Sequence, residues 1–438
     1  NRNNLDRSIS PYLRQHADNP VNWQEWSEDV LSMAREQGKK IFVSIGYSTC
    51  HWCHVMASEA FSDTAIARYL NENFISVKVD REQRPDFDHY FMSFITSTTG
   101  SGGWPLNVFL APDAEPLIAF TYIPVQSRYG MPSMIDVLEA VRDMKKGGGF
   151  NPPRAEAYTR EGTVEELVNY LLAAHDNRYG GVGPGPKFPP SCAMLLLISY
   201  YERYRDKPVK KAIEKTLDAM TGGGLHDHLQ GGFFRYCVDR QWTIPHFEKM
   251  LYDQSMLLWV YSWAYISLKE EKYAHTVRGI LKCLEETFLL DGLYLSAHDA
   301  DTLHVEGGTY TWKYNELMTA LEPYEMNYMK DNYFITGDGK FEGTNHLVRK
   351  KPGVRGNVEH KLLSMRKHRP QPFTDRKIIT SWNAFTGIGL VMAWRALGDK
   401  TLLEKAGKLL DRLLEKHMDG TILAHSSLDG TVQQHEFL

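Results

Sequence analysis

Two cysteines, Cys50 and Cys53, stand in a C-x-x-C spacing within the stretch IFVSIGYSTCHWCHVM at residues 41–56. An apolar, β-branched run ends just before them, and a helical pattern follows Cys50. At the start of a helix, unpaired backbone N–H groups and the helix dipole favour thiolate over thiol. The pattern therefore predicts a thiol–disulfide redox pair, with Cys50 as the attacking nucleophile and Cys53, one turn later and more buried, as the resolving thiol.

The same spacing serves two other chemistries, zinc binding and covalent haem attachment. A four-ligand zinc site usually needs a second C-x-x-C or a matching Cys/His pair, and the sequence contains none. Haem attachment fits the order of Cys50, Cys53 and His54, but it normally requires an exported chain. We therefore expect neither a metal nor a cofactor. The other three cysteines are isolated, and Cys192 opens an apolar stretch in which we expect it to be buried.

Three further residues are expected at the redox site: His51, Trp52 and Pro105. His51 and Trp52 lie between the cysteines, and a protonated His51 would lower the pKa of Cys50 and make the disulfide easier to reduce. Pro105 follows a Gly pair and a Trp at the start of a predicted strand. In thioredoxin-type folds a cis proline at this place lies against the cysteine pair and leaves the preceding backbone free to pair with an extended substrate. The alternative is a trans proline on an edge strand.

Strand and helix patterns alternate up to about residue 125 and must position these residues. The sequence predicts helices at VLSMAREQ and ASEAFSDTAIARYLNENF, and strands at KKIFVSIG, ISVKVD and WPLNVFLAPD. This order is typical of a parallel α/β unit. Residues 126–165 read as a linker region around one short helix, so we predict one domain at residues 1–150 and a second at 151–438.

The second region is dominated by helical patterns, which makes the fold class α/β plus all-α. Loops rich in Gly, Asp, His and Trp separate the predicted helices. Paired helices with such loops suggest an α/α toroid, whose loops at one rim usually build a pocket. An all-helical solenoid is the alternative that periodicity leaves open.

A second set of chemically capable side chains lies in these loops. In TIPHFEKMLYDQ we predict a helix from Pro245, with His246, Lys249 and Asp253 on one stripe. Neighbouring segments add the rest of the candidate pocket: His226, Asp227, Arg235, Trp242, Glu248, Tyr252, His298, Asp299, Asp301, Trp382 and Asn383.

Carboxylates and histidines flanked by aromatic rings suit proton transfer on a carbohydrate, either hydrolytic or epimerising. Two plainer interpretations stay open for this set: a solvated helix face, and a buried polar network that only holds loops together. A metal at the HDH segment lacks a matching partner segment.

The composition limits the classes of partner and the cellular compartment that we expect. The 438 residues carry a formal net charge of −4, which offers no polycationic face for nucleic acid. We see no apolar run long enough to span a membrane and no export signal. Five cysteines are few for this length, so we expect a reducing compartment, the cytoplasm.

Several long motifs resemble the spermatogenesis-associated protein 20 family along essentially the whole chain: SPYLRQHADNPVNWQEW, SIGYSTCHWCHVM, VKVDREQRPD, GGWPLNVFLAPD, GPKFP, GGGLHDHLQGGFFRYCVDRQWTIPHFEKMLYDQ, SAHDAD and ITSWNAF. The resemblance implies a thioredoxin-like N-terminal domain followed by an (α/α)6 toroid of the six-hairpin glycosidase and N-acylglucosamine-epimerase type. Members of this family usually continue past the point equivalent to HEFL, so we expect the toroid to be incomplete at the C-terminus. The resemblance brings no settled reaction.

Three functional hypotheses follow. The first is a thiol–disulfide oxidoreductase module fused to a toroid that binds an unknown substrate or partner, either a protein thiol or disulfide or a small molecule such as a sugar. The second is a carbohydrate-active enzyme, a sugar epimerase or glycoside hydrolase, that uses the toroid pocket. The third is an interaction protein without catalysis.

Overall fold

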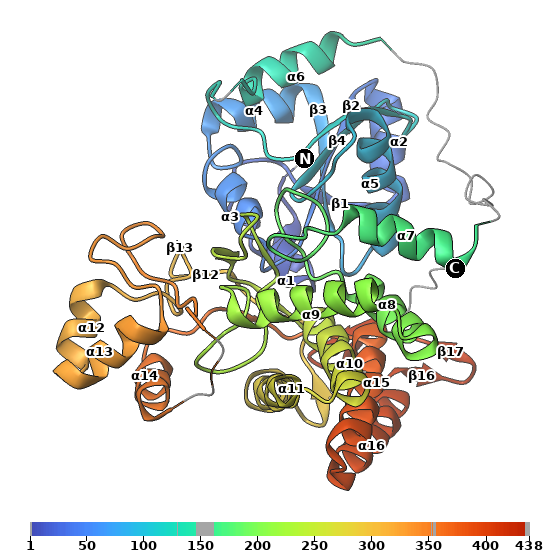
Figure 1. Ribbon diagram of the computed structural model, residues 1–438. Helices are drawn as coiled ribbons and strands as arrows, with labels where there is room; N and C mark the ends of the chain where they lie inside the picture. Colours follow the sequence, from blue (N-terminus) through green and yellow to red (C-terminus); the bar gives the residue numbers. More distant parts are fainter. Residues whose placement is uncertain (1, 129, 146–161, 352, 354–355, 434–438) are drawn as a thin grey trace. The chain divides into compact units, whose positions relative to one another are not determined.

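The computed structural model describes residues 2–128, 130–145, 162–351, 353 and 356–433, which belong to two compact units (Figure 1). Unit 1 holds the described residues up to 145, and unit 2 those from 162 to 433. The boundary that we predict at residue 150 lies outside the described residues.

Unit 1 is built on a five-stranded mixed sheet in the order β1-β3-β2-β4-β5. Strands β1, β3 and β2 run parallel, whereas β4 is antiparallel to β2, and β5 to β4. This is a thioredoxin-like topology, as the family resemblance implies. The strands are β1 (Gln24–Glu25), β2 (Lys40–Gly46), β3 (Phe74–Asp80), β4 (Leu106–Leu110) and β5 (Pro116–Phe120).

The two central strands of this sheet are buried on both faces. Ile41, Val43 and Ile45 of β2 join a core cluster with side chains of the helices α2 (Glu28–Gln37) and α5 (Pro85–Thr99). Because side chains alternate along a strand, Phe42 and Ser44 point to the opposite face. Ser44 lies in register with Lys78 of β3, so a hydroxyl and an amine share this buried face.

The helices of unit 1 begin at side-chain caps or prolines. They are α1 (Pro11–Arg14), α2 (Glu28–Gln37), α3 (His51–Ser58), α4 (Thr64–Asn73), α5 (Pro85–Thr99) and α6 (Met134–Asp143). The single helix predicted over residues 57–74 is wrong, because α3 ends at Ser58 and α4 starts afresh. Asp63 causes the restart: its Oδ1 accepts the backbone N–H groups of Ala65 and Ile66.

Unit 2 is an array of helical hairpins (Figure 1). The hairpins α8/α9, α10/α11 and α15/α16 stand side by side, and α10 contacts both α8 and α15. This arrangement confirms the predicted toroid-like helical domain. Its helices are α7 (Val164–Ala174), α8 (Ser191–Tyr204), α9 (Lys207–Gly222), α10 (Leu251–Leu268), α11 (Glu271–Cys283), α12 (Tyr314–Ala320), α13 (Pro323–Asn332), α14 (Asn357–Lys367), α15 (Thr380–Leu397) and α16 (Lys400–His417).

The central pair of unit 2 packs unusually closely. A Cβ at Gly389 of α15 would lie 3.0 Å from the backbone oxygen of Ser255 in α10, so glycine permits the approach. The hydroxyls of Ser255 and Thr386 meet at 2.7 Å across the same interface. Helix α10 is apolar nearly all round, as a central helix must be. Even so, no helix in the described part of the chain is both long and apolar enough to cross a bilayer.

Short strands of two or three residues join the loops of unit 2, although the sequence predicts only helices there. The ladders combine β6 (Tyr236–Cys237) with β7 (Pro245–His246), β8 (Lys249–Met250) with β11 (Ala297–His298) and β14 (Thr374–Asp375), β9 (Leu289–Leu290) with β10 (Leu293–Tyr294), β12 (Asp301–Thr302) with β13 (Val305–Glu306), β15 (Ile378–Ile379) with β18 (Ser426–Leu428) and β19 (Thr431–Gln433), and β16 (Met418–Asp419) with β17 (Ile422–Leu423).

These ladders correct two expectations. The helix predicted from Pro245 is wrong, because Pro245–His246 and Lys249–Met250 pair with other loops and α10 begins only at Leu251. Tertiary pairing here overrides the local helical period. Cys192, expected to be buried, is exposed near the start of α8.

Candidate active site

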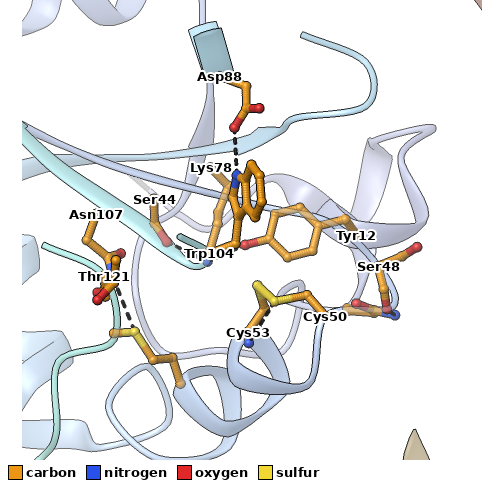
Figure 2. Close-up of a disulfide and its surroundings, with 12 residues drawn as sticks. Tyr12, Ser44, Ser48, Cys50, Cys53, Lys78, Asp88, Trp104, Asn107 and Thr121 are labelled. Atoms are coloured by element: carbon orange, nitrogen blue, oxygen red, sulfur yellow. Dashed lines mark hydrogen bonds between the residues drawn. A yellow bond between two sulfur atoms is a disulfide. The ribbon is translucent and has the colours of Figure 1, made fainter. Parts of the chain in front are cut away.

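The two cysteines predicted as a redox pair form a disulfide at the N-terminus of α3 (Figure 2). Cys50 is the N-cap residue of this helix, and its Sγ accepts the backbone N–H of Cys53 at 3.2 Å. The helix start therefore offers a donor to the sulfur that is expected to carry negative charge. Cys50 is 4% exposed and Cys53 is 2% exposed, so burial hardly distinguishes the two.

The intervening residues differ in their access to solvent. His51 is half-buried, whereas Trp52 is 40% exposed and its ring lies 5.1 Å from that of Tyr122. His51 and Trp52 also contact each other edge to face. The indole of Trp52, two residues after Cys50, is thus an exposed apolar surface next to the disulfide.

The proline predicted beside the pair follows a cis peptide bond, Trp104–Pro105. Ile45 pairs with Leu106 across β2 and β4, which brings Pro105 to the end of β2 that leads into the cysteines. The preceding Trp104 is firmly held: its Nε1 donates to Asp88, and the guanidinium of Arg81 lies 3.8 Å above its ring.

The carboxylate of Asp88 contacts both Trp104 and Arg81. It accepts from Trp104 at 2.6 Å through Oδ1 and pairs with Nε of Arg81 at 3.3 Å through Oδ2. Burial raises the pKa of Asp88, and Arg81 and the indole N–H offset only part of that effect. Arg81, Asp88 and Trp104 are absent from the sequence-based site. The sequence gives one indication of this group, which is that Trp104 stands directly before Pro105.

A fully buried lysine lies behind the disulfide (Figure 2). Lys78 Nζ donates to Oγ of Ser44 at 3.0 Å and to the hydroxyl of Tyr12 at 3.2 Å. The rings of Trp23 and Phe61 lie 4.7 and 4.3 Å from it. Burial holds the pKa of Lys78 well below its usual value, because the charged form loses its hydration.

Gly46, at the end of β2, brings the Lys78 network close to the cysteines. A Cβ there would lie 2.5 Å from the Tyr12 hydroxyl and 2.7 Å from Sγ of Cys53. Only a glycine hydrogen fits between them. The phenol and the sulfur thus face the same small space.

In unit 2, the structure brings together six residues of the predicted pocket: Arg235, His246, Glu248, Tyr252, Asp253 and Trp382. His246 Nδ1 contacts Oε1 of Glu306 at 2.5 Å, and Arg235 pairs with Asp253 at 3.4 Å. Tyr252 packs edge to face on Trp382 at 4.7 Å.

Three further residues complete this loop cluster and are missed by the sequence analysis: Phe188, Tyr236 and Glu306. Tyr236 stacks on Phe188 at 4.4 Å and lies 4.7 Å from the ring of His246. Burial, followed by the charges of Glu248 and Glu306, raises the pKa of Tyr236. Asp301 lies in register with Glu306 and so borders the cluster.

Two predicted pocket residues instead form a buried ionic lock. Asp227 accepts Lys249 Nζ at 2.7 Å and both terminal nitrogens of Arg366 at 2.9 and 2.8 Å. All three side chains are buried. Burial alone would raise the pKa of Asp227, but Arg366 and Lys249 outweigh it and hold that pKa well below the usual value.

The remaining predicted residues make buried structural contacts. Trp242 donates to the backbone oxygen of Tyr179 at 3.1 Å, and Asn383 bonds both the backbone N–H and the carbonyl of Tyr294. His298 meets Oγ1 of Thr374 at 2.9 Å, and burial lowers its pKa to about 3. Asp299 is buried, and its carboxylate accepts the N–H of Asp301.

His226 lies apart from the loop cluster, at a separate cavity of about 660 Å³. Its ring contacts that of His228 at 5.0 Å. The cationic side chains on the wall of this cavity include Lys272, Arg278 and Arg349. Gly353 also lines the wall, and the residues on either side of it in the sequence lie outside the described residues. Across the described ranges, no group of three or more His, Cys, Asp or Glu side chains is arranged to hold a metal ion.

Comparison with known proteins finds a family model and several relatives that match this chain. Residues 2–149 match a family described as Thioredox_DsbH, a protein of unknown function, DUF255. The human protein named spermatogenesis-associated protein 20 is 33% identical over 492 residues, which cover 95% of this chain and 61% of that protein. The mouse and rat proteins of the same name are each 32% identical, so the chain is similar to spermatogenesis-associated protein 20 over nearly its whole length.

Two further proteins are similar to this chain. Uncharacterized protein B0495.5 of Caenorhabditis elegans is 34% identical over 468 residues, 93% of this chain and 64% of that protein. The chain thus spans less than two thirds of the length of these relatives. A crystal structure of D-mannose isomerase is similar over 62% of this chain and 55% of its own, with 11% identity and a TM-score of 0.41.

Proposed function

We propose that unit 1 catalyses thiol–disulfide exchange, with Cys50 as the nucleophile and Cys53 as the resolving thiol. The observation that carries the proposal is the Cys50–Cys53 disulfide at the start of α3, with the Trp104–Pro105 peptide beside it. The natural partner is a protein thiol or disulfide, in a reducing cytoplasmic setting where the reduced pair is regenerated.

The exchange proceeds in two steps. The Cys50 thiolate attacks one sulfur of a partner disulfide, the partner's S–S bond breaks, and one partner thiolate leaves. The Cys53 thiolate then attacks Sγ of Cys50, which closes the Cys50–Cys53 bond and releases the second partner thiolate. The two protein sulfurs are oxidised as the two partner sulfurs are reduced, and each released thiolate takes a proton from water.

An insulin-reduction assay with dithiothreitol as the electron donor tests the proposal. The wild type should precipitate insulin chains well above the rate of dithiothreitol alone, and Cys50→Ser should fall to that background. Cys53→Ser should accumulate a mixed disulfide with insulin, visible on a non-reducing gel, because Cys50 can still attack. Equal rates for the wild type and Cys50→Ser would refute the activity.

We also propose a second candidate function, a carbohydrate site at the loop cluster of unit 2. Its support is the position of the His246–Glu306 pair beside the stacked rings of Tyr236 and Phe188, of which Phe188 is 48% exposed. Aromatic faces bind sugar rings, and a histidine–carboxylate pair can transfer protons.

A screen of unmodified and reducing sugars by proton NMR tests this function. Epimerisation or hydrolysis should appear with the wild type and disappear in His246→Gln and Glu306→Gln. Exposed His275, on α11, provides the matched control His275→Gln. Unchanged turnover in all three variants would remove this candidate.

A further inference from the structure

The cavity beside His226 in unit 2 has no part in either proposed function. Its volume of about 660 Å³ lies in the range that holds a small-molecule ligand. Its wall includes the end of α9, the loop with His226 and His228, one face of α11 and part of α14. Tyr273 and His228 on this wall are buried, whereas Arg278 is exposed, so the cavity leads from the surface into the unit.

The charges on the wall of this cavity are unbalanced. Four cationic side chains line it: Lys272, Arg278, Lys282 and Arg349. Asp218 is the only carboxylate among the described residues of the wall, and it pairs with Lys272 at 2.8 Å. Glu359 of α14 pairs with Arg349 at 3.0 Å. The excess positive charge therefore belongs to the two remaining cations, both on α11.

Arg278 and Lys282 are four residues apart on this helix, so their side chains are neighbours on its surface. Arg278 makes no ion pair with any residue in the described ranges. Lys282 Nζ lies 3.7 Å from Oε1 of Glu286, whose Oε2 also contacts Lys367 at 3.3 Å. One carboxylate thus faces two ammonium groups and the adjacent guanidinium faces none, so a bound anion would be stabilised here.

The inner part of the cavity is uncharged. Burial lowers the pKa of His228 well below its usual value, so its imidazole is neutral, and Nε2 donates to the carbonyl of Gly223 at 2.9 Å. Burial also raises the pKa of the Tyr273 phenol, which stays protonated. Gly222, the last residue of α9, leaves room beside them, because a Cβ added there would meet no heavy atom within 4 Å. A ligand that fits this cavity therefore has an anionic end and an uncharged body.

We propose that the cavity binds a small phosphate monoester, with its phosphate on Arg278 and Lys282 and its organic body against Tyr273 and Gly222. A guanidinium can donate two parallel hydrogen bonds to phosphate oxygens, and the ammonium adds another. A phosphate monoester carries about two negative charges near neutral pH, which suits two cations better than a single carboxylate does. The proposal depends on neither the redox function nor the carbohydrate function.

Isothermal titration calorimetry on the full chain tests the site. The probes are glucose 6-phosphate and phenyl phosphate, which carry the same anion on a polar and an apolar body, together with inorganic phosphate and glucose. We expect at least one ester to bind about tenfold or more tightly than inorganic phosphate, because its body fills the cavity, and we expect no binding of glucose. The tighter ester identifies the kind of body that the cavity accepts.

Charge variants test the position of the phosphate. Arg278→Gln and Lys282→Gln should each raise the Kd of the tighter ester about tenfold or more, because each variant removes a charge-assisted hydrogen bond. Both side chains reach solvent, so we expect the variants to keep the wild-type circular dichroism spectrum. Lys408→Gln is the matched control, since Lys408 is exposed on α16 and its replacement removes the same charge from unit 2.

A second variant tests the position of the body. Gly222→Leu should fill part of the cavity and abolish binding of the ester, whereas inorganic phosphate, which needs only the two cations, should keep its Kd. Gly407→Leu is the control, because Gly407 is exposed on α16 and a Cβ there also meets nothing within 4 Å.

Three results would overturn the proposal. Esters that bind no more tightly than inorganic phosphate and are unaffected by Gly222→Leu would mean an adventitious ion only. The absence of binding by both esters would remove the site. An ester Kd in Arg278→Gln equal to that in Lys408→Gln would place the phosphate elsewhere, and this comparison still decides if Gly222→Leu does not fold.

Discussion

The indole Nε1 of Trp104 donates to Oδ1 of Asp88 at 2.6 Å, which ties the residue before the cis proline to helix α5. The same carboxylate pairs with Arg81, whose guanidinium covers the indole ring. The indole ring of Trp104 is therefore held at its edge by the hydrogen bond to Asp88 and on its face by Arg81. We expect an extended partner to pair with this backbone, so we expect the Asp88 carboxylate to control where that partner lies relative to Cys50.

Asp88→Ala should lower kcat/KM for insulin reduction by about tenfold, because a misplaced partner meets the nucleophile in fewer productive encounters. Alkylation of Cys50 by a small reagent should keep its rate, since that reagent does not use the Trp104 backbone. Asp86→Ala is the matched control: Asp86 lies on the same helix and pairs with Arg84 at the surface. If the two variants behave alike, Asp88 has no positioning role.

Gly46→Ala should destabilise unit 1 and disturb the cysteine pair. The added methyl would overlap the Tyr12 hydroxyl and Cys53 Sγ, and such overpacking in a core costs about 1–3 kcal/mol. Gly103→Ala adds the same methyl in the same unit and meets only Thr121 Cγ2, at 3.8 Å. Thermal unfolding should show a lower Tm for Gly46→Ala alone. Equal Tm values would mean that the space behind Cys53 is wider than described.

Local spacing was enough to predict the pairing of Cys50 with Cys53. The C-x-x-C segment and the proline after a Gly pair each carry their information within a few residues, so the disulfide, the helix start and the cis bond could be predicted. Lys78 could not, because in the alternating strand ISVKVD a lysine looks like a solvent-facing residue. It is buried by Tyr12, which is 66 residues away in the sequence.

The pocket predicted in unit 2 shows the opposite difficulty. His, Asp and Lys side chains that are close in sequence predict one site, but the pairing of the loops places them in different parts of unit 2. Asp227 and Lys249 enter a lock with Arg366, which is 139 residues from Asp227, while His246 meets Glu306 in another loop. The pairing of distant loops decides which of these side chains meet, and the periodicity of the sequence does not encode that pairing.

Asp227→Ala should lower the free energy of unfolding by about 3–5 kcal/mol, because two buried cations then lose their common anion. Asp218→Ala is the control, since its pair with Lys272 lies at the surface and is worth at most about 1 kcal/mol. Urea unfolding followed by near-ultraviolet circular dichroism measures both. Replacing all three lock residues together, as Asp227→Leu with Lys249→Met and Arg366→Met, should recover much of the loss. A small effect of Asp227→Ala alone would show that water reaches the lock.

His298 should make unit 2 lose stability in mild acid. Its folded pKa is lowered to about 3 by burial, whereas the unfolded imidazole titrates near 6.5, so the two states bind protons equally above that pH and differ below it. As the pH falls from 7 to 4, the unfolded chain takes up a proton that the folded chain refuses, which costs about 3 kcal/mol. His298→Gln keeps a polar group for Thr374 and should remove that part of the slope, whereas His275→Gln on the exposed face of α11 should leave it unchanged. Urea unfolding at a series of pH values provides the comparison, and parallel pH profiles for the wild type and His298→Gln would show that His298 accepts its proton in the folded protein.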